Sequence, residues 1–265
     1  MKSSLTGVLI VGHGTRSPLG QAQFLWLVKQ LQAGLAPLPV EPAFLELAAP
    51  TIDDAVGRLV GRGIEHLVTV PLLLFAAGHA KEDIPSEVRA ALTKHDKAEL
   101  RSVQAAHFGC HPALLELSRL RLHEVQGATE EEHSLQQSTT CHLLVGRGSR
   151  DETATAEMVE YARICQQSTQ LSTEIAFLAM AQPTVSEQLA ACASRGFERV
   201  VVQPHLLFHG DLIDRLQRQV AAARINHQHI DWLIADTLAD APSVLGSASK
   251  LLQVVVRDRC QACGL

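Results

Sequence analysis

The sequence predicts an α/β protein made of two tandem halves, each built on a parallel sheet. Short apolar runs typical of buried strands alternate with longer helical patterns along the whole chain, and segments of the first half recur in the second. Strict alternation of strand and helix is typical of parallel sheets, because each parallel crossover needs a connecting helix. A 46% hydrophobic content with only 4% aromatic residues also favours α/β layers over a β-sandwich.

Three segments of the first half recur in the same order in the second half, 133 or 134 residues further along the chain. They match in five of nine, five of nine and seven of thirteen positions. The pairs are VLIVGHGTR at 8–16 with HLLVGRGSR at 142–150, FLELAAPTI at 44–52 with FLAMAQPTV at 177–185, and GIEHLVTVPLLLF at 63–75 with GFERVVVQPHLLF at 196–208. Colinear matches at a nearly constant spacing indicate an internal duplication. We therefore predict an N-terminal half at 1–127, a polar linker at 128–140 and a C-terminal half at 141–265.

Each half is expected to contain four strands and four helices in alternation. The strands are short apolar runs, whereas the helices are longer segments in which apolar residues return every three to four positions. Strands are predicted at 7–11, 40–45, 67–70 and 99–103, and at 142–145, 174–178, 199–202 and 231–235. Helices are predicted at 19–35, 51–62, 80–95 and 112–125, and at 151–168, 184–194, 211–223 and 242–259.

Charge and composition exclude several classes of protein. The net charge of -5 argues against a general nucleic-acid-binding protein, because neutralising phosphates requires a basic surface. The N-terminal apolar run is too short for a signal peptide, and no segment approaches the roughly 20 apolar residues of a membrane span. We therefore expect a cytoplasmic protein that binds neither nucleic acid nor membrane.

The six cysteines are scattered along the chain and are expected to be reduced thiols. Cys260 and Cys263, close to the C-terminal end of the sequence, are expected to be a solvent-exposed pair. They are not expected to hold an iron–sulfur cluster, because such a cluster needs four thiolates.

Polar side chains follow three predicted strands of the first half, at the edge of the sheet where the carboxyl ends of parallel strands meet. His13 lies in a glycine-flanked turn after the first strand, Glu46 follows the second, and the loop after the third contains His79 and Lys81. Two imidazoles and a carboxylate suit a divalent first-row metal such as cobalt, nickel, iron or zinc. The alternative is that these side chains are structural polar groups.

The second half serves as an internal control for this candidate site. When the two halves are aligned, His13 becomes Arg147, Glu46 becomes Ala179, and His79 has no histidine counterpart. Residues kept in both halves are most simply structural, whereas residues found in one half alone are free to be functional. The repeat therefore favours a site at His13, Glu46 and His79.

Three sequence segments resemble motifs of the class II chelatases, namely VGHGTR, FLELAAPTI and VPLLLFAAGHAKEDIP. The resemblance is to the sirohydrochlorin cobaltochelatase and ferrochelatase family of CbiX/SirB type, in its long two-half form, and it covers nearly the whole chain. It implies two Rossmann-like halves of the chelatase fold with the active cleft between them. It further implies insertion of Co²⁺ or Fe²⁺ into sirohydrochlorin, in cobalamin or sirohaem biosynthesis. By position, the catalytic roles carry over to His13, His79 and Glu46, and metal binding to the two histidines.

The chemistry of metal insertion fits these residue types. Metallation removes two pyrrole N–H protons and delivers one divalent ion, so it needs neutral imidazoles that bind metal and accept protons near pH 7. The macrocycle carries several carboxylates, which basic side chains at the same sheet edges can anchor. The residues expected to bind substrate in this way are Arg16, Lys81, Arg147, Arg150 and His209.

Further expectations follow for cofactors, partners and the remaining histidines. The divalent metal is a substrate, with Ni²⁺ as a third candidate, and no nucleotide is expected because the sequence contains no P-loop and no fitting G-x-G-x-x-G. The protein would be a lyase-class, ATP-independent chelatase that works as a monomer or homodimer. His111, before Pro112, is expected to begin a helix, and His205 is expected to be a structural residue beside a strand end.

Two other functions stay open. A non-catalytic carrier of metal or tetrapyrrole could use the same cleft without turnover, and it would not need a proton-accepting carboxylate beside the metal ligands. A phosphate-transfer enzyme with a nucleophilic histidine in the HGTR turn would instead need clustered arginines and a second activating histidine.

Overall fold

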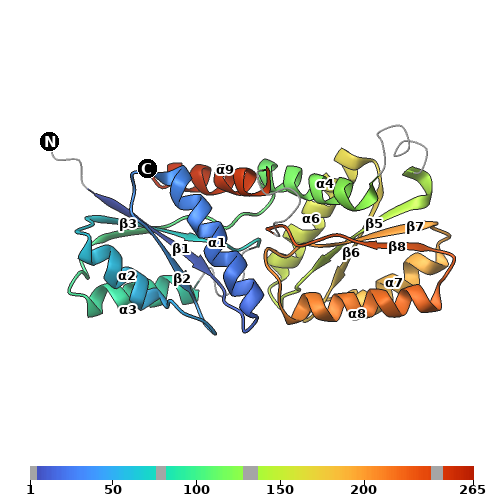
Figure 1. The fold of residues 1–265 in the computed structure, drawn as a ribbon, viewed down its shortest axis with the longest axis horizontal. Helices are drawn as coiled ribbons and strands as arrows, with labels where there is room; N and C mark the ends of the chain where they lie inside the picture. The colour runs from blue at the N-terminus through green and yellow to red at the C-terminus, as the bar shows by residue number, and fades with distance from the viewer. Residues whose placement is uncertain (1–4, 76–81, 128–136, 240–246) are drawn as a thin grey trace. The chain divides into compact units, whose positions relative to one another are not determined.

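The computed structural model describes residues 5–75, 82–127, 137–239 and 247–265. It divides into two compact units, the first formed by residues 1–109 with 241–265 and the second by residues 110–240. Each unit contains one four-stranded parallel sheet flanked by helices (Figure 1). The predicted α/β class with two parallel sheets is therefore confirmed. Among the helices of the described ranges, none is both long and apolar enough to span a bilayer.

The sheet of the first unit has the strand order β2-β1-β3-β4. Its strands are β1 (Thr6–Gly12), β2 (Val40–Phe44), β3 (His66–Pro71) and β4 (Arg101–Gln104). β1 lies inside the sheet, where Leu9 is opposite Glu41 of β2 and Thr69 of β3. The side chains of β1 from Val8 to Val11 are fully buried, as expected of a parallel strand covered on both faces. The end of this strand therefore places His13 in the middle of the sheet edge.

Helices cover both faces of the first sheet. They are α1 (Pro18–Leu35), α2 (Ile52–Gly61), α3 (Ile84–Lys94) and α9 (Ser247–Gln261). α2 and α3 pack together on one face, and α1 and α9 pack together on the other (Figure 1). Leu9 and Val11 belong to the core beneath α2 and α3, while the alternating residues Val8 and Ile10 face the opposite side.

The second unit repeats this arrangement with the strand order β6-β5-β7-β8. Its strands are β5 (Thr140–Gly146), β6 (Ser172–Phe177), β7 (Arg199–Pro204) and β8 (Asp231–Ile234), and its helices are α4 (Pro112–Gln126), α6 (Glu152–Thr169), α7 (Val185–Ser194) and α8 (Asp211–Asn226). α7 and α8 cover the face that carries Leu143 and Val202. α4 and α6 pack against each other. α4 also contacts β7 and β8 and so covers the opposite face of the sheet.

Each compact unit contains the helix that ends the other sequence repeat. α4 ends the first repeat, but it packs against α6, β7 and β8 of the second unit. α9 ends the second repeat, but it packs against α1 and β3 of the first unit. The compact units therefore do not follow the division predicted at residues 127 and 141.

Several element boundaries differ slightly from the predicted ones because the capping residues lie outside the helices. Thr51 and Thr184 are N-caps, so α2 and α7 each begin one residue later than predicted. Both threonines form capping boxes, with Asp54 and Glu187 respectively, which satisfy backbone N–H groups at the first turn. The described end of the predicted linker forms a 3₁₀ turn, η2 (Gln137–Thr139), that runs directly into β5.

The cysteines are all free thiols, as predicted. Cys141, Cys165, Cys192 and Cys260 are buried, whereas Cys110 and Cys263 are half-buried. The expected exposure of both cysteines near the C-terminal end is therefore wrong for Cys260, which is only 2% exposed because it lies on the inward face of α9. Burial raises the pKa of the Cys260 thiol to about 11.

Candidate active site

His13 and Glu46 lie together at the carboxyl edge of the first sheet. The Nδ1 atom of His13 is 3.4 Å from a carboxylate oxygen of Glu46. Backbone hydrogen bonds fix this pairing, because the Glu46 N–H donates to the His13 carbonyl at 3.0 Å and the Leu45 N–H donates to the Gly12 carbonyl at 2.9 Å. The His13 side chain is 20% exposed, although its Nε2 atom is buried, and the Glu46 side chain is 48% exposed.

Gly14 allows the two loops of this pair to touch. Its φ of 104° lies in the left-handed region that favours glycine. A Cβ at this position would overlap the backbone carbonyl of Glu46. The glycine after His13 is therefore required for the close approach of the loops that follow β1 and β2.

The second unit keeps the same backbone without the same side chains. The Ala179 N–H donates to the Arg147 carbonyl at 2.9 Å, and Gly148, with a φ of 89°, approaches the Ala179 carbonyl as Gly14 approaches Glu46. These contacts confirm the alignment of His13 with Arg147 and of Glu46 with Ala179. The scaffold is duplicated, but the imidazole–carboxylate pair is present in one copy.

The other proposed site residues are distributed between the two units. His79 and Lys81 lie outside the described residues, so the structure does not place them. Arg16 is exposed in the loop before α1, and Arg147 and Arg150 are exposed in the corresponding loop of the second unit. No three His, Cys, Asp or Glu side chains of the described ranges gather closely enough to hold a metal ion.

His209 of the second unit lies at the start of α8. Its Nε2 atom is 3.5 Å from a carboxylate oxygen of Asp214, and its side chain is 21% exposed. A protonated His209 would therefore be paired with a carboxylate of its own unit.

Two other histidines have structural roles, as predicted. His111 is the N-cap of α4, where its Nδ1 atom accepts a hydrogen bond from the Ala113 N–H at 3.1 Å. His205 is 2% exposed and its ring lies 4.3 Å from that of Tyr161, centroid to centroid. Burial lowers the pKa of His205 to about 3, so this imidazole is neutral at physiological pH.

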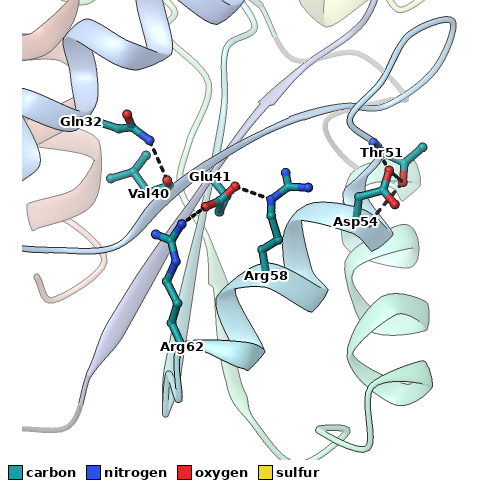
Figure 2. Close-up of polar contacts among 7 residues, drawn as sticks. All are labelled: Gln32, Val40, Glu41, Thr51, Asp54, Arg58 and Arg62. Carbon is teal, nitrogen blue, oxygen red and sulfur yellow. Dashed lines mark hydrogen bonds and ion pairs between the residues drawn. The ribbon is translucent and has the colours of Figure 1, made fainter.

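A buried carboxylate on β2 was not predicted from the sequence. Figure 2 shows it between Arg58 of α2 and Arg62, the C-cap of that helix. Glu41 is 8% exposed and accepts a hydrogen bond from Arg58 at 2.6 Å and another from Arg62. The repeat keeps this pair as Glu174 with Arg195. A check for charged residues kept in both halves would have found it, and its duplication indicates a structural role.

The comparisons with known proteins agree with the duplicated fold. The family model CbiX matches residues 7–125 and again residues 141–253. The chain belongs to the CbiX family. Both matches coincide with the sequence repeat, so each half is one CbiX unit in sequence.

Relatives of this chain include two proteins of Priestia megaterium. Its sirohydrochlorin cobaltochelatase is 28% identical over 259 residues, which cover 97% of this chain and 79% of the relative. Its sirohydrochlorin ferrochelatase is 29% identical over 217 residues, covering 82% of this chain and 78% of the relative.

Solved structures share the CbiX fold over almost the whole chain. SirB from Bacillus subtilis with Fe³⁺ superposes with a TM-score of 0.81 at 23% identity and covers 98% of both chains. A SirB chelatase from Bacillus subtilis subspecies spizizenii in complex with cobalt has a TM-score of 0.76 at 22% identity, and covers 97% of this chain and 96% of its own.

Proposed function

We propose that this chain is a sirohydrochlorin chelatase that inserts Co²⁺ or Fe²⁺ into the tetrapyrrole, in cobalamin or sirohaem biosynthesis. The observation that carries the proposal is the pair of His13 and Glu46, held at 3.4 Å on a scaffold whose second copy lacks both side chains. Membership of the CbiX family and the names of the relatives support the same activity.

In this proposal His13 and His79 hold the incoming metal ion, and Glu46 orients His13 and accepts protons. Imidazoles that bind metals commonly donate their second ring N–H to a carboxylate, which fixes the ring and makes it a stronger ligand. The His13 Nδ1 atom faces Glu46, so Nε2 would be the atom that binds the metal. As the divalent ion enters the macrocycle, two pyrrole protons leave, and a carboxylate open to solvent can pass them to water.

Basic residues would hold the carboxylates of the substrate. Arg16 and Lys81 in the first unit, and Arg147, Arg150 and His209 in the second, are proposed for this role. Arginine suits it because its guanidinium binds a carboxylate through two parallel hydrogen bonds. His209 would contribute only when substrate displaces its interaction with Asp214.

The test is a metallation assay with sirohydrochlorin and Co²⁺, Fe²⁺ or Ni²⁺ in turn, without nucleotide, followed by absorbance. We expect multiple turnovers well above the spontaneous rate with cobalt or iron. If the protein binds metal or tetrapyrrole but produces no more than one metallated product per protein molecule, the result would support the carrier instead. No enhancement with any of the metals would refute the chelatase.

Two variants test the site itself. His13→Ala removes the imidazole, and Glu46→Ala installs the residue that the second unit carries on the same backbone. Each is expected to lower the rate about a hundredfold or more, because His13→Ala removes a proposed metal ligand and Glu46→Ala removes the group proposed to orient it and accept protons. The melting temperature should stay near that of the wild type, because Ala179 keeps the equivalent backbone hydrogen bond. His229→Ala, at an exposed histidine outside the site, serves as the control.

A further inference from the structure

His107 lies in the loop that follows β4, at the same edge of the first sheet as His13 and Glu46. The strands of this sheet are parallel, so the loops after them begin at one edge. The loop between β4 and α4 contains two histidines, and His111 is used as the N-cap of α4. His107 is half-buried and lies before that cap, so the helix does not explain its presence.

Backbone hydrogen bonds fix the loop after β4 against the loop after β3. Two N–H groups of the first loop donate to carbonyls of the second, Phe108 to Leu73 at 2.9 Å and Gly109 to Leu74 at 2.7 Å. The Arg259 side chain of α9 also donates to the Phe108 carbonyl, at 2.8 Å. The position of His107, directly before Phe108, is therefore set by ordered backbone.

The second unit repeats this frame. Its loop after β8 donates two backbone hydrogen bonds to the loop after β7, from Leu238 to Leu206 at 2.9 Å and from Ala239 to Leu207 at 3.0 Å. The two acceptors align with those of the first unit in the sequence repeat. Arg121 of α4 donates to the Leu238 carbonyl, as an arginine of α9 does in the first unit. Thr237, directly before Leu238, therefore occupies the position of His107.

The imidazole of His107 is thus present in one unit alone. The hydrogen bonds that hold its loop occur in both units, so they are structural. The side chain itself differs, because Thr237 is only 2% exposed and has no imidazole. The same contrast between a duplicated scaffold and an unduplicated side chain separates His13 and Glu46 from their counterparts. His107 belongs to the unit that carries this imidazole–carboxylate pair.

The position of His107 does not suit a third metal ligand beside His13 and Glu46. β3 lies between β1 and β4, so the loops after β1 and β4 begin about 10 Å apart, which is two strand spacings. All three residues are among those that the structure describes, and they do not form a group that could hold one metal ion. A role for His107 at this edge is therefore separate from metal binding by the pair.

We propose that His107 binds a carboxylate at the rim of the tetrapyrrole. This inference rests on the proposed chelatase function and deepens it. The carboxylates of the macrocycle lie at its periphery, displaced from the central nitrogens that receive the metal, as His107 is displaced from His13. An imidazole N–H donates a hydrogen bond to a carboxylate, and the bond is stronger when the ring is protonated. Arg16 follows β1 and Lys81 follows β3, so His107 adds a donor after β4.

The experiment varies the charge at position 107. His107→Thr installs the residue of the second unit, His107→Arg keeps a charged donor, and His107→Glu introduces a carboxylate. Sirohydrochlorin binding is measured without metal by fluorescence titration, and thermal unfolding is followed on the same samples. His107→Thr should raise the dissociation constant about five- to tenfold, the effect of losing one hydrogen bond to a charged group. His107→Arg should bind about as tightly as the wild type, and His107→Glu more weakly than His107→Thr, because like charges repel.

The metallation assay separates binding from chemistry. KM of His107→Thr should rise by a similar factor while kcat changes little, because a contact with the rim is the same before and during metal insertion. His66→Thr is the matched control. His66 is also half-buried, but it begins β3 at the opposite edge of the same sheet, so its replacement should leave sirohydrochlorin binding unchanged.

The outcomes separate this inference from the proposed function. If the wild type neither binds nor metallates sirohydrochlorin, the chelatase proposal fails and takes this inference with it. If the wild type is active and the three variants bind as tightly as it does, only the inference is wrong. It is also wrong if His107→Arg binds as weakly as His107→Glu, or if all three variants lose binding and melting temperature together, because the imidazole would then have a packing role.

Discussion

At the scale of single residues, the repeat also shows which buried polar residues are present in one unit alone. His142 on β5 and His205 after β7 are almost completely buried in the second unit. Val8 and Leu72 occupy the equivalent positions of the first unit, as the strand registers show. His142 hydrogen-bonds to the Gln203 side chain at 2.6 Å, and Gln203 donates to Ser118 of α4 at 2.8 Å. These buried polar residues therefore link the second sheet to the helix contributed by the first repeat.

The two buried histidines predict how stability depends on pH. Burial lowers the pKa of His142 to about 4 and that of His205 to about 3. The unfolded chain binds protons below its ordinary histidine pKa of about 6.5, whereas the folded chain does not. Stability is therefore fully present above pH 6.5 and is lost as the pH falls from there toward 4 and 3. Between pH 7.5 and pH 5 each histidine should cost about 2 kcal/mol of unfolding free energy.

Urea unfolding at several pH values between 7.5 and 5 measures this effect. A variant carrying His142→Val and His205→Leu, the residues of the first unit, should lose about 4 kcal/mol less over this range than the wild type. His229→Ala, at an exposed histidine, should behave as the wild type. Equal pH dependence in the double variant and the wild type would show that these imidazoles do not control acid stability.

At the scale of elements, the buried ion pair of β2 fixes the helix that follows the candidate site. Glu41 is buried, whereas Arg58 and Arg62 on the other side of the pair are 42% and 50% exposed (Figure 2). Removing the carboxylate leaves two cations in water, but removing both arginines leaves an unpaired charge in the interior. The second loss is the more costly, because a buried charge without a partner has lost its hydration.

This asymmetry predicts the order of stability for two variants. Arg58→Ala combined with Arg62→Ala should lower the unfolding free energy by about 3 kcal/mol, whereas Glu41→Met should lower it by about 1 kcal/mol or less. Urea unfolding at pH 7.5 provides the measurement. A larger loss for Glu41→Met would mean that the carboxylate contributes net stability and that its burial is not the dominant cost.

The sequence was sufficient to predict most of the elements and the proximity of two candidate site residues. Periodicity placed the strands and helices because buried parallel strands and amphipathic helices have different apolar spacing. Alignment of the halves identified His13 and Glu46, which the structure brings together. The pairing of Glu41 with Arg62 depends on how α2 lies against β2, which spacing alone does not specify.

At the scale of the whole molecule, the exchange of α4 and α9 was not predictable for a related reason. Each helix ends a repeat and has an apolar face, and apolar periodicity alone does not specify which sheet that face covers. Specific contacts decide this in the structure. Arg121 of α4 donates to the Leu238 carbonyl in the second unit at 3.4 Å. Gln253 of α9 donates to the Gln30 carbonyl of α1 at 3.0 Å.

This exchange predicts which fragments of the chain can fold alone. Residues 110–240 contain the complete second unit in one continuous segment, including α4. Residues 128–265 contain the second sequence repeat, but they lack α4 and carry α9 without the sheet on which it packs.

We expect the fragment 110–240 to unfold cooperatively in urea, with helical circular dichroism. The fragment 128–265 should unfold without cooperativity or aggregate, because one face of its sheet and one face of α9 are uncovered. Adding the separate fragment 1–127 to it should restore a cooperative transition, since each fragment then supplies the helix that the other lacks. If 128–265 folds alone and 110–240 does not, the folding units follow the sequence repeat, and the exchange of helices forms only in the intact chain.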